Sequence, residues 1–240
     1  MSVGPTFRAG IIAAGDGARL RANGWTGSKA MAAVGGLPLI DHALNRFAAN
    51  GIVQVSVIIN ETSVDCRNHL AARRCAPAIH LIVRTTASSF ASFALLAAWL
   101  AGERAVITTV DAIMPKNAFA HFLASAARLP VDAIGLGVTR HVEDETPLWT
   151  ELDPIDGRIR RIGGRPAAHV TAGVYALPAN MQMLAGAQFD RLRDYLGQLV
   201  EAGRPVYGIE LPTVLDVDRP GDLVQAEQAL ASWRAMGENS

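Results

Sequence analysis

Residues 8–20 read RAGIIAAGDGARL, an apolar run that ends in a glycine-rich turn. The run at 8–14 predicts a buried β-strand, because short apolar stretches bounded by turn residues are typical of parallel sheets. Gly15 and Gly17 lack a Cβ, so the backbone N–H groups that follow the strand can approach a phosphate closely. An ordinary tight turn between a strand and a helix would use the same residues. The stretch therefore predicts either a phosphate-binding loop or a plain turn.

Outside this stretch, apolar runs alternate with amphipathic segments, a rhythm typical of an α/β fold with a largely parallel sheet. We expect further strands at residues 52–59, 80–84, 105–110 and 131–139, and near Val206 and Val214. We expect helices at residues 38–49, 64–74, 88–101, 115–128, 181–202 and 221–236. Between residues 147 and 177 the pattern changes to short strands, and Asp156-Gly157 predicts a hairpin turn. The chain, residues 1–240, is expected to form one domain with residues 147–177 as a β-rich, substrate-binding insertion.

The composition excludes several classes of protein. The 240 residues carry 22 basic and 22 acidic side chains, so the chain lacks the positive excess of a general nucleic-acid binder. Hydrophobic residues make up 50% and charged residues 18%, which favours a folded core over disorder. No apolar run approaches the roughly 20 residues of a membrane span, and the first residues show no signal-peptide pattern. Because Cys66 and Cys75 form neither a disulfide framework nor a zinc motif, we expect a reduced, cytoplasmic protein. The sequence does not indicate its oligomeric state.

Three carboxylates are expected near the edge of the sheet where ligands bind. Asp111 follows the buried strand at 105–110, and ligands of open α/β sheets bind at the carboxyl ends of strands. Asp216 and Asp218 alternate along a predicted strand and can share one face. Adjacent carboxylates repel each other unless a cation neutralises them, so the set indicates a metal site. The plain alternatives are a loop cap at Asp111 and a helix cap at Asp218.

Residues 13–20, AAGDGARL, are followed by TGSKAM at 26–31 and by GGLPLIDHAL at 35–44. This order resembles the signature of nucleotidyltransferases that couple a nucleoside triphosphate to a sugar phosphate or alcohol phosphate, namely a strand, AAGxGxR[LM], a short loop and PKxL. Ser28 stands where the family usually has proline, whereas Lys29 fits. The chain has 20 arginines and two lysines, so composition alone would rarely supply a lysine here. The resemblance implies a three-layer α/β/α, Rossmann-like and GT-A-like fold with a mixed, mainly parallel sheet.

The resemblance also implies roles for individual residues. The catalytic cations on the triphosphate would be Arg19 and Lys29, and the Mg²⁺ cofactor would be held by Asp111 with Asp216 or Asp218. The nucleotide would lie against Ala13, Ala14, Gly15, Gly17, Ser88 and Ser89, although serines at 88 and 89 are also ordinary helix caps. In the sugar-phosphate members, a hairpin, an EKP motif and a Gly-[IV]-Tyr strand bind the acceptor. This chain has GRP instead, so Arg165 would contact the acceptor phosphate beside Gly173, and Gly164 leaves out the glutamate that contacts sugar hydroxyls.

The predicted function is transfer of a nucleoside monophosphate from a nucleoside triphosphate to a phosphorylated sugar or alcohol, with release of pyrophosphate. UTP, CTP and dTTP are the favoured nucleotides, and the attacking phosphate is already ionised, so no general base is required. A molybdopterin-type nucleotidyltransferase shares much of the signature, and residues 88–92 favour it slightly. A nucleotide-sugar glycosyltransferase would normally carry a DxD pair where Val110-Asp111-Ala112 stands. The remaining alternative is a non-catalytic nucleotide sensor.

Overall fold

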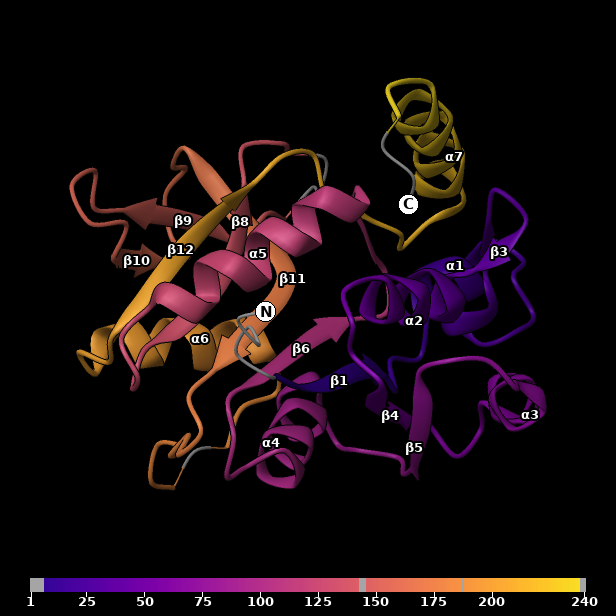
Figure 1. Cartoon of the computed structure of the whole chain (residues 1–240), viewed down its shortest axis with the longest axis horizontal. Helices are drawn as coiled ribbons and strands as arrows, with labels where there is room; N and C mark the ends of the chain where they lie inside the picture. The colour runs from indigo at the N-terminus through magenta and orange to yellow at the C-terminus, as the bar shows by residue number, and fades with distance from the viewer. Residues whose placement is uncertain (1–6, 143–145, 187, 238–240) are drawn as a thin grey trace.

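The computed structural model describes residues 7–142, 146–186 and 188–237. At its centre lies a parallel sheet in the order β6 (Ala105–Thr109), β1 (Arg8–Ala13), β4 (Gln54–Ile59) and β5 (Ala78–Val83) (Figure 1). The stretch RAGIIA is the strand β1, between β6 and β4. The glycine-rich turn therefore leaves the carboxyl end of a central strand, as the apolar run predicted.

An antiparallel strand, β11 (His169–Leu177), continues the sheet beyond β6. Its last residues pair with β6, and its first residues pair with β9 (Trp149–Leu152), which is joined to the outer strand β10 (Ile159–Ile162). β11 also pairs with β8 (Ile134–Thr139), which is parallel to β12 (Val206–Leu211). The short strands expected between residues 147 and 177 thus belong to the same nine-stranded mixed sheet.

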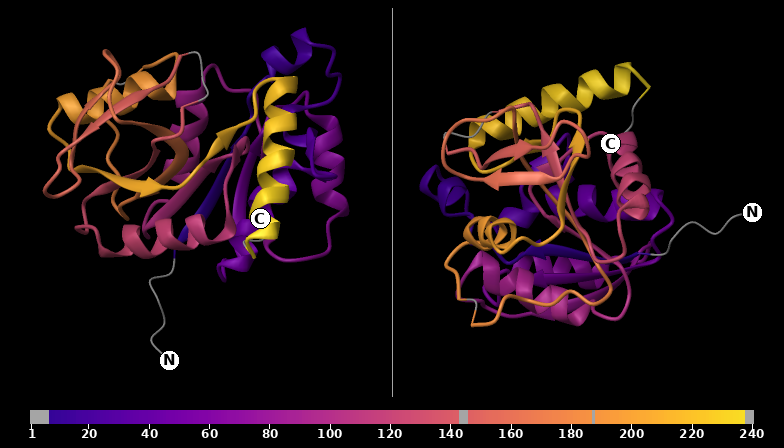
Figure 2. Two further views of the ribbon diagram at one scale, coloured as in Figure 1. Left: turned by 90° about the horizontal axis from the view of Figure 1, so that it is seen from above. Right: turned by 90° about the vertical axis from the view of Figure 1, so that its left-hand side faces the viewer.

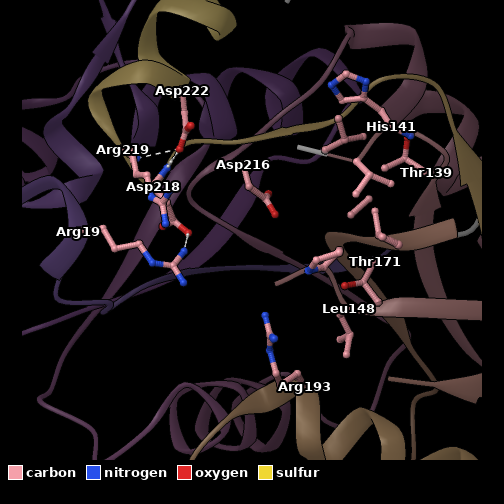
Figure 3. A pocket seen from close by; sticks show the side chains of 15 residues that line it. Arg19, Thr139, His141, Leu148, Thr171, Arg193, Asp216, Asp218, Arg219 and Asp222 are labelled. Atoms are coloured by element: carbon pink, nitrogen blue, oxygen red, sulfur yellow. Dashed lines mark hydrogen bonds and ion pairs between the residues drawn. The ribbon is translucent and has the colours of Figure 1, made fainter. Parts of the chain in front are cut away.

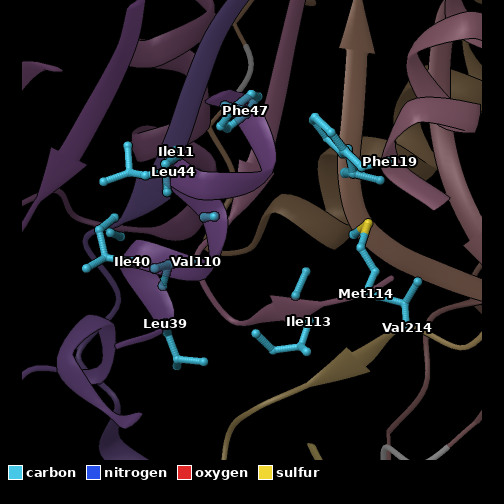
Figure 4. Close-up of a cluster of buried hydrophobic side chains, with 14 of the residues drawn as sticks. Ile11, Leu39, Ile40, Leu44, Phe47, Val110, Ile113, Met114, Phe119 and Val214 are labelled. Atoms are coloured by element: carbon cyan, nitrogen blue, oxygen red, sulfur yellow. The ribbon is translucent and has the colours of Figure 1, made fainter. Parts of the chain in front are cut away.

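Helices cover both faces of this sheet. The first face carries α2 (Leu39–Ala49), α3 (Val64–Ala72), α5 (Lys116–Arg128) and α7 (Pro220–Ala235), and the second carries α4 (Ser89–Trp99) and α6 (Leu192–Glu201) (Figures 1 and 2). Successive residues of a strand point to opposite faces. Ile11 accordingly packs in the first core cluster with Phe47 and Phe119 (Figure 4), whereas Ile12 packs in the second with Phe93. The three-layer α/β/α prediction is confirmed.

Most predicted elements are present with small shifts at their ends. The helix predicted at 181–202 is the main error, because α6 begins only at Leu192 and residues 181–186 and 188–191 form no helix. Met181, Met183 and Leu184 pack against the second core cluster from an irregular chain, so their spacing reflects burial rather than helical turns. Gly186 has a φ of +69°, which a helix does not accommodate.

Several short elements were not predicted from the sequence. They are α1 (Ala18–Ala22), a 3₁₀ turn at Lys29–Met31, β2 (Ala33–Val34), β3 (Leu37–Pro38) and β7 (Ala112–Ile113). The strand expected near Val214 is the short β13 (Leu215–Asp216). The predicted hairpin turn is present, with Gly157 at φ +74° between β9 and β10. Among the described residues, no helix has both the length and the apolar content needed to cross a membrane.

Candidate active site

The glycine-rich turn and Lys29 are in direct contact. Gly17 precedes α1 in the left-handed conformation, with φ +61°. A Cβ at this position would lie 2.9 Å from the Cβ of Lys29, so both the backbone conformation and the close approach require glycine. At Gly15, by contrast, an added Cβ would meet no atom within 4 Å. The turn therefore has two sides, one packed on Lys29 and one that faces open space.

A two-stranded ladder brings the predicted carboxylates together. β7 follows Asp111 and pairs antiparallel with β13, so that Ala112 faces Asp216. The N–H of Val217 donates to the carbonyl of Asp111 over 3.2 Å. Asp218 lies beyond the end of β13 and does not share a strand with Asp216, contrary to the sequence-based expectation. Two segments more than 100 residues apart thus place their acids at one edge of the sheet.

Lys29 bridges two of these carboxylates. Its Nζ forms ion pairs with Oδ2 of Asp111 and with Oδ1 of Asp218, and its side chain is only 9% exposed. Arg19 completes the group by donating from NH1 to Oδ2 of Asp218 over 2.8 Å. We call Arg19, Lys29, Asp111 and Asp218 the ion cluster. Its two positive and two negative side chains neutralise one another.

The electrostatics of the ion cluster follow from burial and pairing. Burial alone lowers the pKa of Lys29, but the neighbouring Asp111 and Asp218 carboxylates outweigh it and raise that pKa above its usual range. Burial raises the pKa of Asp111, yet the ion pair with Lys29 holds it below the usual value. Lys29 and Asp111 are therefore both charged at neutral pH, although both are largely withdrawn from water.

Asp222 orients the third segment of the site. It lies in the first turn of α7, and its Oδ2 accepts hydrogen bonds from the N–H groups of Asp218 and Arg219, both over 2.8 Å. The helix cap is Arg219 rather than Asp218, so the plain alternative for Asp218 is not what the structure contains. The carboxyl group of Asp218 remains directed to Lys29 and Arg19.

The donor set is compatible with a magnesium ion shared with phosphate. Oxygens of Asp111 and Asp218 converge on one point, at present held by the ammonium of Lys29, and Asp216 is adjacent across the β7–β13 ladder. Mg²⁺ prefers oxygen ligands and is typically held by one or two carboxylates with substrate phosphates. No group of three or more His, Cys, Asp or Glu side chains among the described residues is arranged to hold a metal by itself. These residues fit a jointly held ion better than a protein-only cage.

A pocket of about 110 Å³ opens beside the ion cluster (Figure 3). Asp216 and Arg193 both point into it, the first from the β13 segment and the second from the start of α6. Its far wall comes from β8, β11 and the residues after them, and includes Thr139, His141, Leu148, Val170 and Thr171. The pocket thus lies between the β13 segment, which carries Asp216, and the antiparallel strands β8 and β11.

Gly173 lies at the bend of β11, next to the carboxylates. Its φ is +63°, and a Cβ there would lie 2.5 Å from Oγ1 of Thr109 and 3.7 Å from Oδ1 of Asp216. The register of β11 against β8 shifts between Thr171 and Tyr175, so the glycine allows the strand to bend around the pocket. The structure places Gly173 at the site, while its predicted part in acceptor binding stays a prediction.

Arg165 lies elsewhere. Its side chain is 78% exposed, with its NH2 3.8 Å from Glu151, and it is not among the described residues that line the pocket. The neighbouring Arg160, which is exposed, and Arg161, which is half-buried, pair with acids of the same hairpin. The structure does not bring Arg165 to the ion cluster, since the hairpin that carries it extends along the outer edge of the sheet.

Ser88 and Ser89 have local structural partners. Ser88 caps α4 by accepting from the N–H of Ala91 over 3.0 Å, and it donates to the carbonyl of Phe189 over 2.8 Å. The hydroxyl of Ser89 accepts from the N–H of Leu192 over 2.9 Å. Both serines therefore join α4 to the start of α6. Ser88 also borders a second, larger pocket of about 710 Å³, on the α4 side of the sheet.

Sequence reasoning missed Arg193, Arg219, His141, Thr139 and Thr171, all of which line the pocket. Arg219 directly follows the candidate ligand Asp218, and this adjacency in the sequence could have indicated that Arg219 lies at the site. Arg193 was hidden because the helix that carries it was predicted to begin eleven residues too early, at 181 instead of 192. The threonines and His141 belong to strand ends that only the tertiary pairing of β8 with β11 brings together.

A protein-family model matches the part of the chain that contains most of this site. Residues 9–201 match the model of the MobA-like NTP transferase domain, which is most of the chain and includes the glycine-rich turn, Lys29 and Asp111. The chain belongs to this nucleotidyltransferase family. A search of curated protein sequences found no significant match to this chain. The family match confirms the resemblance seen in AAGDGARL and TGSKAM.

Solved structures share the fold over nearly the whole chain. The inositol-1-phosphate CTP transferase of T. maritima aligns with a TM-score of 0.77 at 20% identity, covering 94% of this chain and 96% of that one. A putative glucose-1-phosphate thymidylyltransferase of Bacillus anthracis, in complex with a sucrose, aligns at 0.72 and 15% identity over 93% and 95%. A UDP-glucose pyrophosphorylase complexed with UDP-glucose aligns at 0.74 and 11% identity over 95% and 99%. At these identities the likeness establishes the fold alone.

Proposed function

We propose that this MobA-like family member transfers a nucleoside monophosphate from a nucleoside triphosphate to a phosphorylated sugar or alcohol. In this reaction, an oxygen of the acceptor phosphate forms a bond to the α-phosphorus. The bond between the α-phosphorus and the bridging oxygen of the β-phosphate breaks, and pyrophosphate leaves. UTP, CTP and dTTP are the nucleotides that we favour.

The observation that carries the proposal is the burial of Lys29 beside the glycine-rich turn, between Asp111 and Asp218. A buried lysine with two carboxylates at the carboxyl end of a parallel sheet is suited to a ligand that carries both phosphates and a metal. Triphosphate and Mg²⁺ together have the same mixture of charges as the ion cluster. The neutral overall charge of the chain is therefore no obstacle to this polyanionic substrate.

The residues divide the work by charge and position. Lys29 and Arg19 bind and orient the triphosphate, where negative charge accumulates as the leaving group departs. Asp111, with Asp216 or Asp218, would hold Mg²⁺, which supplies positive charge to the phosphate oxygens when bound. At Gly15 the turn faces open space, so the nucleotide can approach the protein backbone at this edge of the sheet. The acceptor phosphate is ionised at neutral pH, so no side chain is needed to remove a proton.

The experiment is a pyrophosphate-release assay with the five common triphosphates against a panel of sugar phosphates and alcohol phosphates, with and without Mg²⁺. Release that depends on both substrates and on the metal supports the proposal. Release of nucleoside diphosphate from a nucleotide sugar would indicate a glycosyltransferase instead. Thermal stabilisation by a triphosphate without turnover on any acceptor would indicate a nucleotide sensor.

A molybdopterin-type transfer remains a second candidate, because the matching family model is described as MobA-like. The same assay with molybdopterin as acceptor tests it. Turnover with molybdopterin and GTP, but with none of the sugar or alcohol phosphates, would favour that candidate over the first.

A further inference from the structure

Arg193 differs from the other arginines around the cleft in what it contacts. Its side chain rises from the first turn of α6 and points into the pocket toward Asp216 (Figure 3). Its NH1 donates to the carbonyl of Thr146 over 3.2 Å, and no carboxylate of the described residues pairs with it. Arg19 and Arg140, by contrast, pair with Asp218 and with Glu210.

Tyr175 of β11 is buried in the second core cluster, and its pKa is raised, first by burial and then by the carboxylates of Asp216 and Asp111. The positive charge of Arg193 acts on this pKa in the opposite direction. This direction agrees with the position of Arg193 in the pocket that Asp216 also lines.

The pocket is lined by both hydrocarbon and charged side chains. Its hydrocarbon side chains are Val142, Pro147, Leu148, Val170, Ala172 and Val214. The neutral hydroxyls are those of Thr139 and Thr171, with His141 beside them. The volume of about 110 Å³ is well below the roughly 300 Å³ at the lower end of common ligand pockets. Such a space suits one charged group with a short carbon chain.

We propose that Arg193 binds the acceptor phosphate and that the acceptor is the phosphate monoester of a small alcohol rather than a hexose phosphate. This inference rests on the proposed nucleotidyl transfer and specifies its second substrate. A guanidinium binds a phosphate through two parallel N–H···O bonds, and a short alkyl chain can pack on the valines and Leu148. A hexose phosphate is a larger group, and the pocket volume of about 110 Å³ favours the smaller ester.

The assignment also decides between two arginines. The resemblance to sugar-phosphate enzymes predicted Arg165 as the acceptor contact, but that side chain is highly exposed beside Glu151. Arg193 lines the pocket, as do Asp216 and Asp218, two of the three carboxylates that could hold the metal. A phosphate bound at Arg193 would lie in the same pocket as the ion cluster, which is where an acceptor oxygen must be to reach the triphosphate.

The test measures binding of defined phosphates by calorimetry, with and without a non-hydrolysable triphosphate and Mg²⁺. The probes are propyl phosphate, glycerol 3-phosphate and glucose 1-phosphate, and the proteins are the wild type, R193Q, R193K, R165Q and R160Q. We expect the two small esters to bind the wild type at least about tenfold more tightly than glucose 1-phosphate. R193Q should weaken them about ten- to a hundredfold, as for loss of a charge-assisted hydrogen bond. R193K should fall between, and the matched control R160Q should equal the wild type.

Three results would overturn the inference: equal or tighter binding of glucose 1-phosphate, unchanged binding in R193Q with a loss in R165Q, or no binding of any of the three esters. Circular dichroism of each variant confirms that it is folded. The pyrophosphate assay separates this inference from the proposed function. Small-ester binding through Arg193 without pyrophosphate release would contradict only the proposed reaction, whereas efficient turnover of hexose phosphates would contradict only the acceptor assigned here.

Discussion

The two parts of the sheet that meet at the cleft place their charges differently. In the part that we propose binds the nucleotide, residues 7–114 (the nucleotide half), two of the ion pairs centre on a buried cation: Lys29 is 9% exposed, and Arg73 is 10% exposed in its pair with Asp41. In the part that we propose binds the acceptor, residues 133–217 (the acceptor half), the arginines in the described ion pairs are more exposed, as with Arg140, which is 64% exposed beside Glu210. Both halves contain arginines and acids in similar types of pairs, so composition does not distinguish them. Burial does.

This difference indicates how each half holds its ligand. A buried charge keeps one position, because leaving its partner exposes an uncompensated charge to a poor solvent. Exposed pairs contribute little and can rearrange at small cost. We therefore interpret the nucleotide half as preorganised for one constant group, the triphosphate, and the acceptor half as the part in which specificity can change.

The largest effect is expected for Lys29→Met. Removal of the ammonium takes away the positive charge on the triphosphate and leaves Asp111 and Asp218 facing each other. The rate of pyrophosphate release should fall about a thousandfold or more, a loss of about 4 kcal/mol in transition-state stabilisation. Steady-state kinetics with a saturating nucleotide and acceptor measure it.

The chain offers a matched control, because its other lysine, Lys116, is exposed at the start of α5. Lys116→Met should retain wild-type activity. The two unpaired carboxylates of Lys29→Met should also attract a divalent ion, so Mn²⁺ without nucleotide should raise its melting temperature more than that of the wild type. Near-normal turnover in folded Lys29→Met would remove the central role given to the buried half.

The sequence predicted the nucleotide half well for a physical reason. The turn at 13–20 and Lys29 are close in the chain, and their roles depend on local requirements such as a positive φ at Gly17. The end of β6 at Asp111 likewise follows from one apolar run. Local patterns of this kind remain visible without knowledge of tertiary structure.

The acceptor half was predicted less well because its geometry depends on distant pairings. Arg193 reaches the pocket only because residues 181–186 and 188–191 are irregular and α6 starts at Leu192. Helical spacing of buried methionines gave the opposite indication. Arg165 occupies the position of the lysine in the EKP motif, but it follows β10 at the outer edge of the sheet, and no local pattern reveals this placement. The alignment of Asp111 with Asp216 also depends on a ladder between residues about 100 positions apart.

A pair of arginine substitutions tests the difference in burial directly. Arg73→Gln leaves the carboxylate of Asp41, which is 6% exposed, without its guanidinium partner and with only the imidazole of His69 at 2.7 Å, and should cost about 3 kcal/mol of unfolding free energy. Arg160→Gln removes an exposed pair with Asp153 and should cost less than about 1 kcal/mol. Urea unfolding at neutral pH measures both. Equal losses would show that burial does not separate the two halves energetically.

Two glycines of the same turn provide a smaller and more local comparison. Gly17→Ala forces an L-residue into φ +61° and places its Cβ 2.9 Å from that of Lys29, so stability should fall by about 2 kcal/mol. Gly15→Ala meets no atom within 4 Å and should change stability by less than about 0.5 kcal/mol. Its methyl group should instead weaken triphosphate binding, measured by calorimetry. If Gly15→Ala binds nucleotide normally, the open side of the turn is not where the nucleotide lies.

The smallest effect is the pH dependence of stability, which we expect in different pH ranges for the two halves. His42 is buried in α2, where burial lowers its pKa below 6.5 despite the hydrogen bond between Nε2 and the carbonyl of Val34. The unfolded chain therefore takes up a proton at this position before the folded protein does, and stability should fall as the pH drops below about 6.5. In the acceptor half, the hydrogen bond from Arg140 lowers the pKa of Glu210, so that contribution is lost only at more acidic pH, below about 4.3. Urea unfolding between pH 7.5 and 5 should thus show a decline that His42→Gln reduces and Glu210→Gln leaves unchanged. Amide exchange at pH 5.5 should increase in α2 before it does in β12, and the reverse order would mean that the buried half is not the acid-sensitive one.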